Sequence, residues 1–94
     1  MFEYIVGNLV ERTPTQSVIE NNGIAYVFQN SINSFEQLSK PNPLKVYMHV
    51  SIREDAHTLF GFASLEERTM FRSLISVSGI GPSSALAALS SYKP

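Results

Sequence analysis

Two clusters of residues in this 94-residue sequence have the types and spacing to do chemistry. The first is a pair of adjacent acids, Glu54 and Asp55, at the corner of the stretch "SIREDAHTLFGF" between two runs of strand-forming residues. Adjacent carboxylates on a tight turn concentrate negative charge. On a generic domain such acids serve solubility and discourage edge-to-edge pairing of strands. A sharper role for them depends on the rest of the sequence.

The second cluster is the turn Gly79, Ile80 and Gly81, followed by a proline and then by Ser83 and Ser84. The glycines let the backbone turn sharply and let another surface come close. The proline suits the first turn of a following helix, whose first N–H groups are unpaired and carry partial positive charge. Such a helix start binds phosphate without Lys or Arg. The same pattern also occurs in plain turns between helices, and spacing alone favours neither.

The overall charge argues against a basic binding surface. The formal net charge is −1 and the pI is near 6.1, so the phosphate-neutralising footprint of most nucleic-acid-binding proteins is missing. Any nucleic-acid binding must therefore be local. With no cysteine there is no disulfide framework and no thiolate metal site, which fits a reducing cytoplasm. The start of the sequence reads as neither a signal peptide nor a membrane span, so we expect a cytoplasmic protein without a membrane partner.

Catalytic chemistry is not expected. His49 and His57 lack the acid-rich spacing of a metal site. No nucleophile with a base and an orienting group can be assembled from the spacing, and there is no phosphate-binding loop of the ATPase type. The sequence therefore predicts a protein that is not an enzyme and needs neither a metal nor a cofactor.

Five strands are expected. The dipeptide Asn22-Gly23 separates two runs rich in β-branched and aromatic residues, which is the strongest short-range signal for a hairpin. Gly7, inside an apolar run, indicates a bulge or a sharp bend of the kind that small barrels need at a corner. A short helical turn around "NSFEQL" and the loop "SKPNP" come before the fourth strand. The predicted strands are 4–11, 17–21, 24–29, 44–54 and 58–62, which suit a five-stranded, partly open barrel of the OB type.

The fourth predicted strand, 44–54, alternates between two faces. Its apolar face, expected to be buried, carries Val46, Met48, Val50 and Ile52. Its other face, expected to be polar and in solvent, carries Lys45, Tyr47, His49, Ser51 and Arg53.

After residue 63 the period changes to that of helices. Ser64 and Glu67 form a capping box, in which Ser64 accepts from the amide of Glu67 and the Glu67 carboxylate reaches back. The helix that starts here is expected to end at Gly79 and to pack through its apolar residues, Leu65, Phe71, Leu74 and Ile75. A second helix begins at Pro82 and has an apolar side formed by Ala85, Leu86 and Leu89.

No third helix is predicted to cover this pair. Two short helices bury little surface by themselves, so we expect the natural protein to continue past residue 94. The predicted domains are 1–63, an OB-type barrel with the acidic corner, and 64–94, the first part of a truncated helical domain.

Aromatic residues on the predicted strands allow a different function. They could form a base-stacking platform on the barrel, as in single-strand binders, or they could simply be core; strand alternation favours the core for most of them. These residues are Tyr4, Tyr26, Phe28, Tyr47, Phe60 and Phe62. An OB-type binder of single-stranded nucleic acid is therefore the alternative function, and a protein-interaction scaffold is a third.

Three motifs in order, "REDAHTLFGF", "ERTMFRSLI" and "SGIGPSSALAALS", resemble the RuvA family of Holliday-junction branch-migration proteins, and "YIVGNLVE" and "NNGIAYVF" match that family's opening. The resemblance implies an OB-fold followed by the first of two helix-hairpin-helix motifs. It implies a non-catalytic subunit that recognises four-way DNA junctions in recombination and repair, as a homotetramer. It also implies two protein partners, the RuvB motor ATPase, bound through a C-terminal domain absent from these residues, and the RuvC resolvase.

The same resemblance assigns roles to individual residues. Glu54 and Asp55 match the acidic pin, which the family points at the junction centre to keep strands apart. Arg53 either contacts a phosphate beside the pin or lies in solvent. The residues matched to the phosphate-binding hairpin are Gly79, Ile80, Gly81, Ser83 and Ser84.

One position departs from the family. Ser83 stands where a lysine is usual, so a cationic phosphate contact is lost. Arg68 and Arg72, four residues apart on the predicted helix, either compensate for this loss or form an ordinary solvated face.

Overall fold

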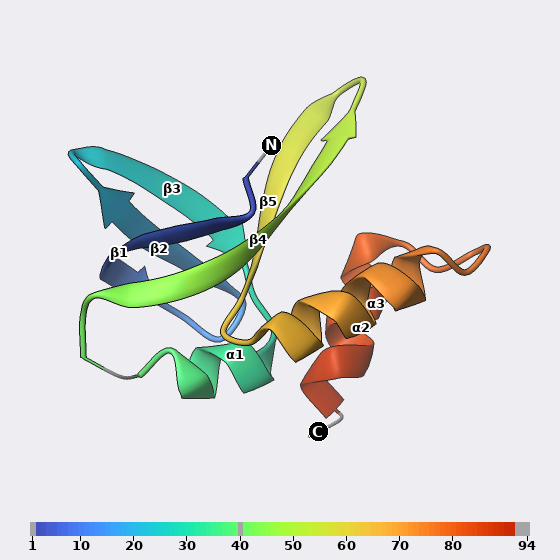
Figure 1. Ribbon diagram of the computed structural model, residues 1–94. Coiled ribbons are helices and arrows are strands. Elements are labelled where there is room, and N and C mark those ends of the chain that lie inside the picture. The colour runs from blue at the N-terminus through green and yellow to red at the C-terminus, as the bar shows by residue number, and fades with distance from the viewer. Residues whose placement is uncertain (1, 40, 92–94) are drawn as a thin grey trace.

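The computed structural model describes residues 2–39 and 41–91. A closed five-stranded barrel, with strand order β1-β2-β3-β5-β4, is followed by two helices that pack against its side (Figure 1). This confirms the predicted fold class. The elements are β1 (Tyr4–Arg12), β2 (Gln16–Asn21), β3 (Ile24–Gln29), α1 (Ile32–Gln37), β4 (Leu44–Arg53), β5 (Ala56–Phe62), α2 (Leu65–Ile75) and α3 (Pro82–Ser91).

The β2–β3 hairpin forms as predicted. Asn22 and Gly23 have φ angles of 50° and 85°, the positive values that a tight turn of type I′ requires. β3 then pairs in parallel with β5 at Gln29 and Phe60, and this pairing closes the barrel. All other strand pairs are antiparallel.

β1 changes its partner strand at Gly7. Residues up to Gly7 pair with β4, and residues from Asn8 pair with β2. Of the two alternatives predicted at Gly7, a bulge or a sharp bend at a corner, the bulge is wrong, because the register shifts between Leu9 and Glu11 instead. Glycine is needed at this corner for another reason: a Cβ at Gly7 would lie 2.3 Å from the carbonyl oxygen of Glu20.

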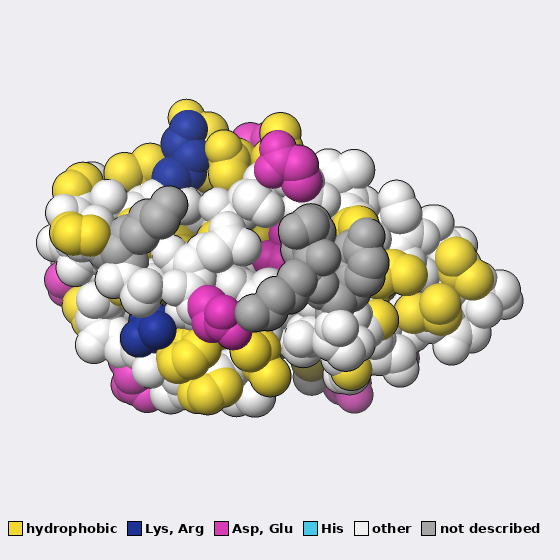
Figure 2. All heavy atoms as spheres, turned by 90° about the horizontal axis from the view of Figure 1, so that it is seen from below, with side chains coloured by type: hydrophobic (Ala, Val, Ile, Leu, Met, Phe, Trp, Pro, Cys, Tyr) yellow, Lys and Arg dark blue, Asp and Glu magenta, His cyan; other side chains and the backbone are white. Residues whose placement is uncertain are grey.

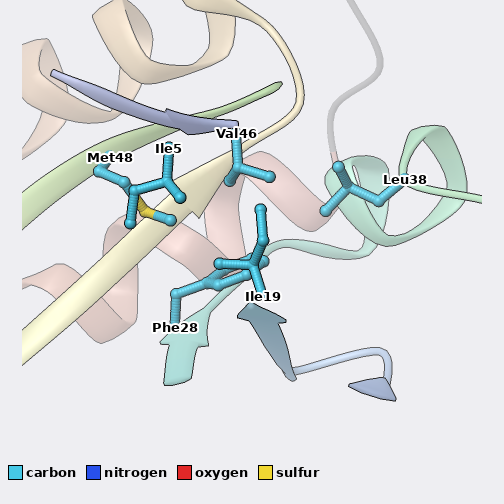
Figure 3. Packing of buried hydrophobic residues seen from close by; sticks show 6 residues of the cluster. All are labelled: Ile5, Ile19, Phe28, Leu38, Val46 and Met48. Atoms are coloured by element: carbon cyan, nitrogen blue, oxygen red, sulfur yellow. The ribbon is translucent and has the colours of Figure 1, made fainter. Parts of the chain in front are cut away.

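Two hydrophobic clusters hold the molecule together. The first fills the barrel, where side chains from β1, β2, β3 and β4 meet Leu38, which follows α1 (Figure 3). It consists of Ile5, Ile19, Phe28, Leu38, Val46 and Met48. The second joins β5 to the helices and consists of Phe60, Phe62, Phe71, Ala85 and Leu89. Burial of this second cluster ties α2 and α3 to the barrel, since burying a large apolar side chain contributes roughly 2 kcal/mol.

β4 departs from its predicted alternation on both of its faces. Val46 and Met48 are fully buried, but Ile52 is 54% exposed, because the β4–β5 hairpin extends beyond the barrel (Figure 1). On the other face, Tyr47 and His49 are half-buried against α2 and do not lie in open solvent.

α2 is shorter and bonded differently than predicted. It ends at Ile75 and not at Gly79. The Ser64 side chain accepts from the N–H of Glu67 at 3.2 Å, as expected. The predicted return contact from the Glu67 carboxylate was wrong, because that carboxylate is buried and binds α1. Leu65, expected to pack, is 43% exposed.

α1 partly covers α3, contrary to the expectation that nothing would. The side-chain amide of Asn33 donates to the carbonyl of Leu89, and the N–H of Ile32 donates to the hydroxyl of Ser90. The barrel and the helices therefore share an interface of packed and hydrogen-bonded groups, and the domain boundary after residue 63 stays a prediction. Within the described part of the chain, no helix is long and apolar enough to cross a membrane.

Candidate nucleic-acid interface

The acidic pair lies at the tip of the longest hairpin. Arg53 pairs with Ala56 across the β4–β5 ladder, so Glu54 and Asp55 form a two-residue turn. The turn points away from the barrel (Figure 1), and both acids are exposed. Neither has a hydrogen bond or an ion pair to any residue within 2–39 or 41–91. Their charge is therefore free to act on whatever approaches the tip.

Arg53 is the corresponding free cation. Among the lysines and arginines that the structure describes, it is the one without a protein partner. The others are held by backbone carbonyls, aromatic rings, a histidine or a carboxylate. Arg53 is exposed at the base of the acidic turn, where a guanidinium can bind a phosphate in bidentate geometry.

The turn between α2 and α3 leaves amides unbonded at the start of α3. Gly79 has a φ of 89°, a conformation that favours glycine. The Gly81 carbonyl accepts from the N–H of Ala85 at 3.0 Å, which makes Gly81 the residue that caps the helix. Because glycine has no side-chain oxygen, Gly81 cannot accept hydrogen bonds from the N–H groups in the first turn of α3. The N–H groups of Ser83 and Ser84 also lack a carbonyl one turn earlier. Both serines are exposed, so these amides can reach an external anion.

The two predicted clusters meet in one groove. Arg53 and Asp55 from the acidic hairpin and Pro82 and Ser83 from the start of α3 line the same depression of about 420 Å³. Polar and apolar side chains both line the rest of it, with Gln29, Ser51 and Thr58 among the polar ones. Ser83 is the one predicted hairpin residue in the lining of this groove, and the others lie outside it: Gly79, Ile80, Gly81 and Ser84. Of the acidic pair, Asp55 lines the groove and Glu54 does not.

Neither reading of Arg68 is correct. Its guanidinium is buried, donates to the carbonyls of Glu3 at 2.7 Å and Met48 at 3.2 Å, and forms an ion pair with the Glu3 carboxylate at 2.7 Å. This hydrogen bond, together with the nearby charge of Arg68, lowers the pKa of Glu3. Arg68 therefore ties α2 to the barrel and is not available to bind a phosphate near Ser83.

Arg72 is exposed but already engaged. Its Nε donates to Nδ1 of His49 at 3.2 Å, which requires a neutral imidazole on that nitrogen. Burial lowers the pKa of His49, and the charges of Arg72 and Arg68 lower it further. His49 is thus a structural acceptor. In the described residues no group of three or more His, Cys, Asp and Glu side chains is placed to hold a metal ion.

The aromatic residues divide between core and surface. Phe28, Phe60 and Phe62 are buried, so they are core and not a stacking platform. Tyr4 is 48% exposed, with the Lys45 ammonium 4.4 Å from its ring centre.

No broad basic surface was found on the face seen from below. There, Lys and Arg side chains form two separate spots among apolar, polar and acidic groups (Figure 2). On this face the described residues therefore offer no broad basic surface to an anion.

Comparison with known proteins identifies the family. The family model described as "RuvA N terminal domain" matches residues 1–61. Proteins named "Holliday junction branch migration complex subunit RuvA" are similar over all 94 residues. The one from Christiangramia forsetii is 46% identical, and those from Cytophaga hutchinsonii and Parabacteroides distasonis are each 47% identical.

These alignments cover 100% of this chain but 49%, 47% and 48% of the three relatives. The chain thus spans about half the length of the curated relatives that it matches. The match of the N-terminal family model to the barrel, together with identity that continues through both helices, shows that this chain belongs to the RuvA family.

Proposed function

We propose that this chain is the junction-binding portion of a non-catalytic DNA-binding subunit, which recognises four-way junctions and holds them open for branch migration. The observation that carries the proposal is the shared groove. It places Arg53 and Asp55 beside Pro82 and Ser83, so the acidic turn and the amide-bearing helix start face the same space. A structure that grips phosphates at one place and repels them at another is suited to a branched target.

The helix start provides the grip. The amides of Ser83 and Ser84 bind phosphate oxygens through hydrogen bonds and through the positive end of the α3 dipole. Contacts of this kind fix the position of DNA without reading its bases. Recognition then depends on where phosphates lie in space, which is the property that distinguishes a junction from a duplex.

The acidic turn separates strands. Two unit charges 4 Å apart interact by about 1 kcal/mol in water and about 4 kcal/mol near a protein surface. At physiological salt the effect fades over about 8 Å. Glu54 and Asp55 therefore act only on phosphates that crowd the tip of the hairpin, as they do where four strands converge. Arg53, at the base of the turn, binds a phosphate of a strand that leaves this point.

The proposal includes the partners that the resemblance implies. These are a homotetramer around the junction, the RuvB motor that supplies ATP-driven motion, the RuvC resolvase, and a cytoplasmic location. The relatives' names, which describe a subunit of a branch migration complex, support the assignment to such an assembly. No cofactor and no catalytic residue is proposed for this chain.

The deciding experiment compares affinities for a four-way junction, a linear duplex of matched sequence and a single strand at one fixed salt concentration. We expect the junction to bind most tightly and the single strand most weakly. Equal affinity for junction and duplex would contradict shape recognition. No binding to any of the three would favour a protein-interaction scaffold.

The alternative, an OB-type single-strand binder, has one observation in its favour, the exposed ring of Tyr4 beside Lys45. Base stacking on such a ring contributes about 1–3 kcal/mol. Tyr4→Ser should leave junction affinity unchanged under the main proposal. A reversed order of affinities, together with a loss of single-strand binding in Tyr4→Ser, would establish the alternative.

A further inference from the structure

α2 carries two consecutive charged side chains that are almost fully buried. Glu67 is 4% exposed and Arg68 is 5% exposed. Such residues are rarely buried unless they are paired. Arg68 is paired with the barrel, through Glu3 and the carbonyl of Met48. Glu67 faces a different neighbour, and neither the proposed grip nor the acidic turn uses it.

Glu67 binds the N-terminus of α1 through both carboxylate oxygens. The hydroxyl of Ser31 donates to Oε2 at 2.5 Å, and the hydroxyl of Ser34 donates to Oε1. Both serines are fully buried. The Ser31 hydroxyl also accepts from the N–H of Ser34, and the Ser34 hydroxyl accepts from the N–H of Ala63 at the end of β5. Hence one carboxylate connects α2, α1 and the last barrel strand.

These contacts join the barrel and α1 to the helix that precedes the second half of the proposed DNA interface. The acidic turn is carried by the β4–β5 hairpin of the barrel, whereas the phosphate-binding amides are carried by α3. α3 is held in turn by α1, through the contact of Asn33 with Leu89 and that of Ile32 with Ser90. α1 is therefore the common support of both helices, and Glu67 is the side chain that fixes α2 to it.

A purely stabilising role explains this arrangement poorly. Burying a charge costs free energy, and well-packed apolar residues often replace a buried ionic group without loss of stability. Unlike an apolar contact, a carboxylate with two hydroxyl donors fixes the orientation of the groups that it joins, because each hydrogen bond requires a defined distance and angle. A network that accepts only one geometry is suited to holding two binding elements at a set spacing.

We propose that Glu67 is a positioning residue for junction recognition. Through Ser31 and Ser34 it fixes α1, which holds the C-terminal end of α3 at Leu89 and Ser90, and so sets the position of α3 relative to the acidic turn. That spacing discriminates a four-way junction from a duplex. The inference rests on the proposed function.

The first test needs no DNA. Because the chain has no cysteine, spin labels can be placed at His57→Cys in β5 and Ala88→Cys in α3, both at exposed positions. The distance distribution between the labels should be narrow in the otherwise unchanged chain. Glu67→Gln, which offers a donor where a hydroxyl already donates, should broaden or shift it. Glu66→Gln, an exposed neighbour with the same loss of charge, should not. An unchanged distribution in Glu67→Gln would overturn the proposal.

The second test measures the ratio of junction affinity to duplex affinity in the same variants without labels. Glu67→Gln should lower this ratio about fivefold while duplex affinity stays within about twofold, since a lost hydrogen bond of ordinary strength corresponds to about that factor. Glu66→Gln corrects for the altered net charge. A ratio that stays constant although the distances change would overturn the positioning role.

A second variant covers the case in which Glu67→Gln fails to fold. Ser34→Ala removes one of the two hydroxyl donors and keeps the carboxylate, and its thermal unfolding reports whether the fold is intact. It should lower the ratio in the same direction. The two hypotheses fail separately: if the unmodified chain shows no junction preference, the proposed function fails, whereas the label distances still decide whether Glu67 sets the geometry.

Discussion

Gly81 is important for the side chain that it lacks. It occupies the position where serine, threonine, aspartate or asparagine usually caps a helix, and a capping side chain there would bond the amides of the following turn. With glycine, the amides of Ser83 and Ser84 stay available for a ligand. At the residue scale, therefore, the candidate grip depends on an unfilled cap, and the acidic turn depends on two carboxylates that have no partner among residues 2–39 and 41–91.

Gly81→Ser should fill the cap and block the grip. A Cβ at this position meets no atom within 4 Å, and its φ is not in the left-handed region, so the fold should be retained or slightly stabilised. Junction and duplex affinity should both fall about tenfold, the loss expected for a charge-assisted hydrogen bond. Gly81→Ala serves as the steric control and should bind more tightly than Gly81→Ser. The more bulky Gly81→Val should weaken binding regardless of DNA sequence. Unchanged affinity in all three variants would remove this turn from the interface.

Neutralising the acidic turn should reduce strand separation without weakening junction binding. In the double variant Glu54→Gln, Asp55→Asn, junction affinity should stay equal or rise up to about fivefold, because repulsion of about 1 kcal/mol is removed. The fluorescence of a base analogue at the junction centre should report less unstacking. Glu20→Gln, an exposed acid in β2, is the control. A large loss of affinity would mean that the acids organise the fold or bind a cation.

His49 should make stability depend on pH. Its pKa in the folded chain lies below the ordinary value of 6.5, mainly because of burial and then because of Arg72. The unfolded chain therefore binds the proton first as pH falls, so stability is full above pH 6.5 and decreases below it. Thermal unfolding at pH 7.5 and pH 5.5 should show a smaller drop in His49→Gln than in the unmodified chain. His57→Gln, at an exposed position, should behave like the unmodified chain, and an equal drop in all three would contradict this assignment.

At the scale of elements, what could be predicted follows from how local each signal is. The Asn22-Gly23 turn and the burial of Val46 and Met48 in β4 depend on neighbouring residues and were predicted correctly. Glu67 was assigned to a local capping box because its true partners, Ser31 and Ser34, lie 36 and 33 positions away. Arg68 was missed for the same reason, since Glu3 is 65 positions away. No periodicity shows such pairs, although two consecutive charges at the edge of an apolar helical face are a usable signal.

The Ser64 cap should contribute measurably to the free energy of unfolding. Its side chain bonds the N–H of Glu67, so Ser64→Ala should lower the free energy of unfolding by about 1 kcal/mol in chemical denaturation. Ser73→Ala, an exposed site inside α2, should leave stability equal or slightly higher, because alanine favours helices. If both variants lose the same amount, the cap is not the cause.

At the scale of the whole molecule, the charge balance determines how DNA is held. A chain with a net charge of −1 cannot rely on a general attraction to phosphates. Under the proposed function, phosphates are bound by neutral amides and by single cations such as Arg53, so the salt dependence of binding should be shallow. The family was predictable from the order of the motifs. That Arg53 and Ser83 line one groove could not be predicted, because it depends on how the closed barrel packs against α3.

Restoring a cation at position 83 should change the salt dependence by a defined amount. Ser83→Lys should raise affinity at low salt and steepen the slope of log affinity against log salt by about one, the value for one additional neutralised phosphate. Ser73→Lys adds the same charge on α2 outside the groove and should have a much smaller effect. Equal slopes for the two variants would show that no phosphate lies near Ser83.

The hydrogen bonds of Glu67 with Ser31 and Ser34 have a consequence for the DNA itself. If the protein keeps its two binding elements at a set spacing, the DNA must do the bending that brings them into register. Bending costs depend on base steps: pyrimidine–purine steps kink easily, while A-tracts resist. Junctions with flexible steps beside the crossover would then be bound preferentially, although no base is contacted. The base sequence would then affect binding through the stiffness of the DNA.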